Sequence, residues 1–596
     1  MMRGLILAWI FLAIPVAMAA DSPQLPPNVY LITIDTLRAD HVHCYGYEKI
    51  ATPAIDGLAK AGVRFSQAFT PSPITNTSHT TILTGLLPSD HGVTDFGIQL
   101  ATSHPTLAQL LAQRGYHTAA FIGAVILDSK SLAPGLDRGF DFYDNFPEHS
   151  TTKERWGRVE RRGADVVKRA EAWMTAHPRA PHFVWIHLYD PHDPYEPPAP
   201  YSQIYKDRLY DGEIAYADAA LANFVAYLKT HNLYENAIIV VVGDHGEGLG
   251  EHQEDTHGIF LYDSTLHVPL VLKLPKNEFG NSLIDAQVRT TDILPTVLDL
   301  VGGPAPEHLD GESLRPLLAK SESGSRIAFG ETDYPLRFGW APLRSVREID
   351  YKFIEAPRPE LYDLHADPGE TKNAYAPWNS EVKKSRDLLA DLRSKLPPKA
   401  ASDATVGQGT LSELRALGYL GPADAGSSTT VPEPSLLPDP KDKIDEQNLL
   451  HRAMLAADSG ETQQARTNLE KVLALNPKSP TALRQLGELE LKAGEYAKAA
   501  EHLKAAQANQ PADATVAYEL GEALAKLNQF SDAREALEAS LKITPAQLPA
   551  RVLLGNVYLQ LKIPSAAADQ FEAALLLDPK STDAKAGLAR AQAAAK

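Results

Sequence analysis

Four prolines towards the end of the chain recur at an interval of 34 residues, and they are Pro477, Pro511, Pro545 and Pro579. Small residues keep the same interval at Gly487, Gly521, Gly555 and Ala589. Proline ends a helix, and a small residue lets two helices approach closely. The period therefore predicts stacked helix-turn-helix units from about Ile444 to the end, which is an all-α solenoid.

This period has a known counterpart. A helix-turn-helix unit of 34 residues resembles the tetratricopeptide repeat, and alanines recur at matching positions, namely Ala499, Ala533 and Ala567. The resemblance implies a module, expected over residues 441–596, that binds a protein or glycan partner or packs against the rest of the chain.

A stretch poor in large apolar residues precedes the repeats. Residues 399–440 are rich in Pro, Ser, Thr, Gly and Ala, a composition that predicts a linker. One short segment within it, Leu411 to Leu420, is more apolar and is expected to dock on a folded part of the chain.

From Asn28 to about Leu396, β-branched runs alternate with helical patterns, which predicts an α/β sheet sandwiched by helices. The expected strands are Val29–Ile34, His182–Leu188 and Ala237–Val242. The clearest expected helices are Thr106–Arg114, Gly163–Ala176 and Asp211–Thr230. Because such sheets bind ligands at the carboxyl edge of their strands, polar residues that follow the strands are the candidate site.

The first residues indicate export. Arg3, an apolar stretch from Leu5 to Met18 and the sequence Ala17-Met18-Ala19 predict a signal peptide over residues 1–19. The chain would then be periplasmic or secreted, with an uncleaved anchor as the alternative. No second apolar run of that length follows, so no membrane span is expected after cleavage.

Charge and cysteine content argue against a nucleic-acid partner and against a disulfide. The net charge of −18 repels phosphate backbones, so nucleic acid is not an expected partner. Cys44 is the only cysteine, so no intramolecular disulfide is expected.

Two polar clusters lie early in the chain. Asp35 follows the first predicted strand, where a carboxylate is well placed to hold a cation. Its alternative is a helix cap or turn residue. The segment Pro73 to His79 puts hydroxyls and amides at the start of a helix, which suits a nucleophile facing an anion. Its alternative is an ordinary Ser/Thr helix cap.

Two further clusters follow the other predicted strands. Gly243-Asp244-His245-Gly246, with His257 close behind, combines imidazole, carboxylate and glycines in a way that favours a divalent metal ion over a solvated loop. The segment His187 to Tyr195 has prolines on both sides of His192 and Asp193, which stiffen the loop. The alternative is that these prolines only turn the chain.

Taken in order, these four segments resemble the sulfatase family of the alkaline phosphatase superfamily. The likeness runs from Asn28 to about Leu396 and includes weaker marks at Thr291 to Thr296, Asp310 to Leu314 and Glu360 to Leu364. It implies a sulfatase-like hydrolase domain, expected over residues 25–398.

The nucleophile motif of that family is altered here. Sulfatases carry C-x-P-S-R or S-x-P-S-R, whose first residue is oxidised to formylglycine, but this chain has Thr75 there, and threonine cannot form formylglycine. His79 replaces the arginine, Asp35-Thr36 replaces a pair of aspartates, and His257 replaces a lysine.

The resemblance also implies roles. Thr75 takes the place of the nucleophile, and His79 and Asn76 would contact the substrate. His257 and His192 would bind the anion or protonate the leaving oxygen, which imidazoles do well near neutral pH.

The threonine favours phosphate over sulfate. A threonine has one oxygen and leaves a covalent adduct that water must attack, which phosphoryl centres tolerate well. Threonine is similar to what nucleotide phosphodiesterases and the phosphoethanolamine and lipoteichoic acid transferases of the superfamily use. We therefore expect hydrolysis of phosphate mono- or diesters. The alternatives are a sulfuric ester hydrolase, or an inactive sulfatase-fold protein that recruits partners through its repeats.

We hypothesise that Asp35, Asp244 and His245 hold one divalent ion, which also contacts the Thr75 hydroxyl and lowers its pKa. Mixed nitrogen and oxygen ligands favour manganese or zinc over calcium. A second ion is not expected, because Asp190 has no histidine four residues later.

Overall fold

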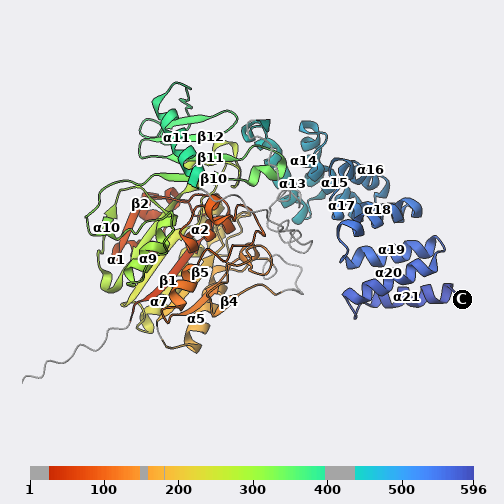
Figure 1. Ribbon diagram of the computed structural model, residues 1–596, viewed down its shortest axis with the longest axis horizontal. Coiled ribbons are helices and arrows are strands. Elements are labelled where there is room, and N and C mark those ends of the chain that lie inside the picture. The colour runs from red at the N-terminus through yellow and green to blue at the C-terminus, as the bar shows by residue number, and fades with distance from the viewer. Residues whose placement is uncertain (1–25, 148–158, 180, 396–435) are drawn as a thin grey trace, which may run out of the picture.

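The chain forms an α/β part followed by an array of paired helices (Figure 1). The structure is a computed structural model that describes residues 26–147, 159–179, 181–395 and 436–596. The predicted signal peptide and the predicted docking segment Leu411 to Leu420 lie outside these described residues. No helix in the described ranges has the length and apolar character needed to cross a membrane.

The main sheet has the strand order β4-β3-β5-β1-β6-β7-β2-β8, with β9 paired to β2. Its strands are β1 (Asn28–Ile34), β2 (Val63–Phe69), β3 (His117–Phe121), β4 (Phe142–Asp144), β5 (His182–Leu188), β6 (Ala237–Gly243), β7 (His267–Lys273), β8 (Ser282–Ile284) and β9 (Val288–Arg289). The neighbouring strands β4, β3, β5, β1 and β6 are parallel to one another. Strand β7 is antiparallel to both β6 and β2. The sheet is therefore mixed, and the three predicted strands are neighbours at its centre.

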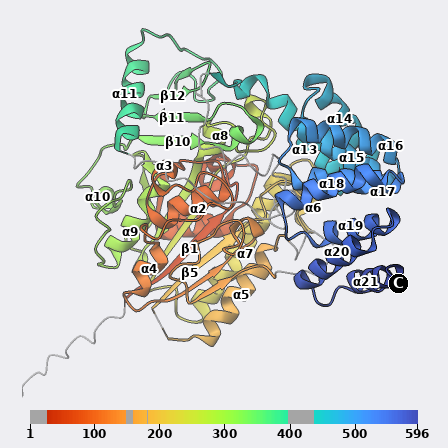
Figure 2. The ribbon, with the colours of Figure 1, turned by 45° about the vertical axis from the view of Figure 1, so that its right-hand side comes forward.

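Helices cover both faces of this sheet (Figures 1 and 2). One face packs on α2 (Thr75–Thr84), α4 (Leu107–Ala112) and α9 (Ile293–Leu300), and the other on α1 (Pro53–Ala61), α5 (Gly163–Ala176) and α7 (Leu209–Thr230). Every residue of β1, β5 and β6 is buried, because both faces are covered. This confirms the predicted sheet sandwiched by helices.

A second, smaller sheet completes the α/β part. It is antiparallel, in the order β10 (Ala328–Thr332), β11 (Leu343–Arg347), β12 (Tyr351–Glu355) and β13 (Glu360–Asp363). Helix α11 (Ser380–Lys395) packs on it through Val382 and Leu389. Short helices lie between the larger elements, namely α3 (Pro88–His91), α6 (Tyr201–Ile204), α8 (Asp263–Leu266) and α10 (Arg315–Leu318).

The C-terminal array confirms the predicted all-α solenoid. Its helices are α13 (Ile444–Asp458), α14 (Thr462–Leu475), α15 (Pro480–Ala493), α16 (Tyr496–Asn509), α17 (Ala514–Lys526), α18 (Phe530–Ile543), α19 (Leu548–Gln560), α20 (Pro564–Leu577) and α21 (Thr582–Ala594). The small residues of the period lie where paired helices touch. A Cβ added at Gly487 would stand 2.5 Å from Cγ of Leu503 on the partner helix.

The array joins the α/β part at its first helix. Ile444 at the start of α13 is 2% exposed and belongs to the main hydrophobic core of the α/β part. Just before it, the Pro438 carbonyl accepts a hydrogen bond from the Ala341 backbone, and Lys441 pairs with Glu360 at 2.6 Å. The end of the predicted linker is thus held against the α/β part.

Candidate active site

The carboxyl ends of three neighbouring strands meet at one point. In the sheet register Ile34 of β1 pairs with Gly243 of β6, and Thr33 pairs with His187 of β5. Asp35 directly follows Ile34, and Asp244 directly follows Gly243, so the two carboxylates lie side by side. Asp35 is 0% exposed, as is Asp244. Two segments that are far apart in the sequence therefore meet at one edge of the sheet. Thr36 and Asp244, for example, are 208 residues apart.

Helix α2 brings the threonine to the same point. Thr75 is the first residue of α2 and is fully buried. Its Oγ1 lies 3.2 Å from Nε2 of His245. The start of a helix exposes backbone N–H groups and carries partial positive charge, so an anion at Thr75 would be favoured.

Asp35, Asp244 and His245 form a compact group of metal-ligating atoms. One atom from each lies within 4.8 Å of the others, and all three residues are buried. Oδ1 of Asp35 is buried without a hydrogen-bond partner. Burial raises the pKa of both carboxyls, and Asp35 further raises that of Asp244. A divalent ion would satisfy the orphaned oxygen and offset both charges, so this donor set fits one.

The ring of His245 is oriented for such a role. Its Nδ1 donates to the Gly246 carbonyl at 2.9 Å, which leaves a lone pair on Nε2. Burial, and then the neighbouring His257, lower the pKa of His245 well below its ordinary value, so the ring is neutral. Neutral imidazole with a lone pair on Nε2 is the form that binds a metal ion.

The glycines of this loop allow the close packing around it. A Cβ added at Gly246 would stand 2.1 Å from the Ser264 carbonyl oxygen. A side chain at that position is therefore excluded, and the loop next to His245 can fold tightly against α8.

Other groups fix the Asp244 carboxylate. Its Oδ1 accepts hydrogen bonds from the backbone N–H groups of Thr36 and His245, at 3.1 and 2.8 Å. The Ser78 hydroxyl donates to Oδ2 at 3.3 Å. Three donors from three separate segments therefore set the direction of this carboxylate.

Three histidine rings lie next to one another, and His245 is the one that contacts the threonine. The ring centroids of His245 and His257 are 4.5 Å apart, and those of His257 and His192 are 5.0 Å apart. Nδ1 of His257 contacts Glu247 Oε1 at 2.9 Å, while Nδ1 of His192 donates to the Asp193 carbonyl at 2.6 Å. Burial lowers the pKa of His257 to about 3, so its ring is neutral.

The two residues expected to contact substrate form hydrogen bonds to other groups of the protein. Nδ1 of His79 donates to the Thr75 carbonyl at 2.7 Å, and its Nε2 accepts from the Thr33 hydroxyl at 2.9 Å. Nδ2 of Asn76 donates to the Asp95 carbonyl at 3.0 Å. Both residues are 0% exposed. In this arrangement they hold the first turn of α2.

Comparisons with known proteins agree with this geometry. The sequence model of the Sulfatase family matches residues 27–303, and that of the C-terminal region of N-sulphoglucosamine sulphohydrolase matches residues 250–399. The chain belongs to the sulfatase family. A tetratricopeptide repeat model matches residues 450–514, 485–547 and 518–584, so this sulfatase-family chain carries C-terminal tetratricopeptide repeats.

Individual relatives are distant, and each match covers about three fifths of this chain. Uncharacterized sulfatase YidJ of Escherichia coli (strain K12) is 26% identical over 440 residues, 62% of this chain and 85% of that protein. An arylsulfatase of Clostridium perfringens is 24% identical over 455 residues, 60% and 92% of the two chains. The crystal structure of a phosphonate monoester hydrolase of Agrobacterium radiobacter has a TM-score of 0.53 and 23% identity, and covers 62% of this chain and 96% of that one.

This sulfatase-family chain is therefore a sulfatase-like ester hydrolase, a hydrolase of sulfate or phosphate esters. The buried group of Asp35, Asp244 and His245 is consistent with the metal site of such enzymes. The family match also implies an anionic ester as substrate, and the repeats indicate interactions with protein.

Several further residues of the site have contacts that the sequence patterns do not indicate. His187 and Glu247 lie inside the predicted clusters and contact Asp35 and His257. Ser78 follows the threonine by one helical turn, the spacing that puts two side chains on one face. Only the helical period indicates a role for Ser78. The residues around His187 do not distinguish it from any other buried residue of a strand.

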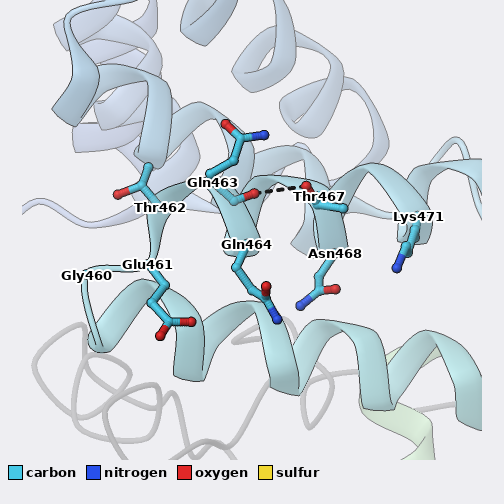
Figure 3. Close-up of a pocket in the computed structure, with 8 residues that line it drawn as sticks. All are labelled: Gly460, Glu461, Thr462, Gln463, Gln464, Thr467, Asn468 and Lys471. Carbon is cyan, nitrogen blue, oxygen red and sulfur yellow. Dashed lines mark hydrogen bonds between the residues drawn. The ribbon is translucent and has the colours of Figure 1, made fainter.

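A polar pocket lies elsewhere, on the first repeat (Figure 3). It is lined by Gly460, Glu461, Thr462, Gln463, Gln464, Thr467, Asn468 and Lys471. These side chains include no histidine or cysteine and share no residue with the group around Thr75. We therefore assign the chemistry to the sheet edge and not to this pocket.

Proposed function

We propose that the chain hydrolyses phosphate mono- or diesters by attack of the Thr75 hydroxyl. The observation that carries this proposal is the contact of 3.2 Å between Thr75 Oγ1 and His245 Nε2, at the start of a helix and beside two buried carboxylates. Sulfate esters are the second candidate, favoured by the likeness to an arylsulfatase.

The metal assignment rests on the donor set. Asp35, Asp244 and His245 would hold one divalent ion, and their mixed oxygen and nitrogen atoms favour manganese or zinc over calcium. Such an ion supplies Lewis acidity, which favours the ionised hydroxyl and offsets charge on the transferred group.

The protein groups then act in a fixed order. The Thr75 hydroxyl loses its proton to solvent, and its oxygen bonds to phosphorus as the bond to the leaving oxygen breaks. By the resemblance to the family, we assign His257 and His192 to binding the anion or to protonating the leaving oxygen, and a neutral ring such as that of His257 must first take up that proton from water. Water then attacks phosphorus, and the threonine oxygen departs and regains a proton.

Phosphate is preferred because threonine lacks the second hydroxyl that a formylglycine hydrate has. A formylglycine hydrate can release sulfate by elimination through its second hydroxyl, whereas the adduct on Thr75 can be released only by direct attack of water. Phosphoryl centres accept that attack well.

Two further assignments belong to this proposal. The chain acts in the periplasm or outside the cell, an assignment supported by the apolar stretch from Leu5 to Met18 and the Ala17-Met18-Ala19 sequence. The repeats bind a protein or glycan partner, as solenoids of this kind commonly do.

The experiment compares aryl phosphate, bis-aryl phosphate and aryl sulfate with the purified exported form, with and without added Mn²⁺ or Zn²⁺. The expected result is metal-dependent turnover of a phosphate ester that falls about a thousandfold or more in Thr75→Ala. Turnover of the sulfate that survives Thr75→Ala would contradict the threonine mechanism. A chain that holds no metal and turns over no ester would instead support the inactive, partner-binding alternative.

A further inference from the structure

The first repeat helix, α13, contacts the loop that follows β5. Nε2 of His451 lies 2.7 Å from Oδ2 of Asp193, and the two side chains are 10% and 14% exposed. The Asp193 carbonyl in turn accepts the hydrogen bond of His192 Nδ1. A residue of the repeats thus holds the residue that orients a histidine of the site.

The same helix also contacts the loop that follows β6. Nδ2 of Asn448 donates to the Gln253 carbonyl at 2.7 Å, and its Oδ1 accepts from the Asp255 backbone N–H at 3.3 Å. Arg452 pairs with the Asp255 carboxylate at 2.6 Å. Asp255 precedes His257 by two residues, so these contacts lie close in sequence to a histidine of the site.

The repeat period shows that α13 is specialised for these contacts. The later repeats have leucine at the position of Arg452, and these residues are Leu486, Leu520 and Leu554. Each leucine is buried in a core shared with the preceding repeat. In α13, the first helix of the described array, an arginine stands at this position and pairs with Asp255 in the loop that follows β6.

The charge at this junction favours the contact. Burial opposes a charged ring at His451, but Asp193, Glu247 and Asp255 together raise the pKa of His451 above its ordinary value. An imidazolium paired with a largely buried carboxylate is held more firmly than a surface ion pair.

We propose that α13 is a positioning element of the active site. His451 holds the loop of His192, and Asn448 holds the loop of His257. The tetratricopeptide module is then part of the catalytic unit and not only a tether for a partner. This inference rests on the proposed function of the histidines, although the order of the two loops can be measured separately.

The variants are His451→Ala, His451→Gln and Asn448→Ala in the full chain. His502→Ala is the matched control, because His502 contacts Glu490 at 2.8 Å within the repeats, on helices that follow the first repeat. For each variant we would measure kcat and KM for the phosphate ester, the dissociation constant of inorganic phosphate, metal content, melting temperature, and hydrogen exchange of the two loops.

Both alanine variants at α13 should lower kcat/KM by about tenfold to a hundredfold, because small displacements of positioned groups have effects of that size. They should also weaken phosphate binding and speed hydrogen exchange in their own loop, with metal content unchanged. His451→Gln can still donate to Asp193 and should recover most of the loss. His502→Ala should stay within about twofold of the wild type.

The inference is overturned if both α13 variants match His502→Ala in kinetics and in loop exchange. It is also overturned if their losses only follow metal content or melting temperature, since α13 would then be a structural support. Should His451→Ala fail to fold, Asn448→Ala decides by the same criteria. If the wild type turns over no ester, the proposed function fails, whereas loop exchange still judges the role of α13.

Discussion

Nε2 of His187 lies 3.1 Å from Oδ2 of Asp35, and the other nitrogen of the same ring accepts the Gly123 backbone N–H at 3.2 Å. Because Nδ1 is an acceptor, Nε2 carries the proton and donates it to the carboxylate. Oδ2 is thus committed to a protein donor, and Oδ1 is the oxygen left for a cation.

Replacement of His187 should therefore weaken metal binding without removing a ligand. His187→Ala is expected to raise the dissociation constant of the metal ion about tenfold to a hundredfold, as loss of groups that orient a ligand usually does. His187→Gln, whose amide can still donate to Asp35, should lose less metal affinity. Metal titration by calorimetry measures both, and equal affinity in all three proteins would contradict this orienting role.

Removal of the metal should destabilise the fold. Two buried carboxylates whose pKa values are raised by burial repel each other when no cation lies between them. At a free metal concentration of about a hundred times its dissociation constant, binding adds about 2.7 kcal/mol to the free energy of unfolding. Chelation should lower the melting temperature accordingly, and Asp244→Asn should abolish most of that response.

The pH dependence of stability should change at Glu213. Burial, with Asp190 nearby, raises the pKa of Glu213 to about 8, above its ordinary value of 4.5. The folded protein thus keeps a proton that the unfolded chain releases, so this group lowers stability as pH rises from about 4.5 to 8. Glu213→Gln should lose less stability than the wild type over that range.

Urea unfolding at several pH values measures this difference. Glu278→Gln is the control, because Glu278 is exposed on the surface, and it should keep the wild-type slope. A Glu213→Gln protein with an unchanged slope would show that Glu213 titrates alike in the folded and unfolded states.

One substitution should have opposite effects at two glycines. Gly487→Ala puts a Cβ 2.5 Å from Leu503 and should lower the free energy of unfolding of the repeats by about 1–3 kcal/mol. Gly57→Ala lies on the exposed side of α1, where a Cβ meets nothing within 4 Å, and should raise stability by about 0.5–1 kcal/mol. Thermal unfolding checks both, and a stable Gly487→Ala would contradict the tight helix packing.

Much of the fold could be predicted because its signals are local. Continuous apolar runs predicted β1, β5 and β6 to within one residue, and the 34-residue period predicted the solenoid. The runs also predicted that polar residues following neighbouring parallel strands meet at one edge, as Asp35 and Asp244 do. The period of α7 predicted its end at Thr230, although the helix begins at Leu209, two residues before the predicted start.

Other features depend on contacts between distant segments. The antiparallel direction of β7 follows from its pairing with β2 and β6, which its own composition does not specify. His451 and Asp193 are 258 residues apart, and nothing near either residue distinguishes their contact from a surface ion pair. The orienting role of His187 likewise depends on Gly123, a residue of another loop.

The most direct test of the central claim is to trap the covalent adduct. The enzyme would be mixed with an aryl phosphate, quenched in acid within milliseconds, digested and examined by mass spectrometry. A phosphoryl group is expected on Thr75 in the wild type and none in Thr75→Ala. Turnover without any adduct on Thr75, or an adduct on another residue, would contradict the threonine mechanism.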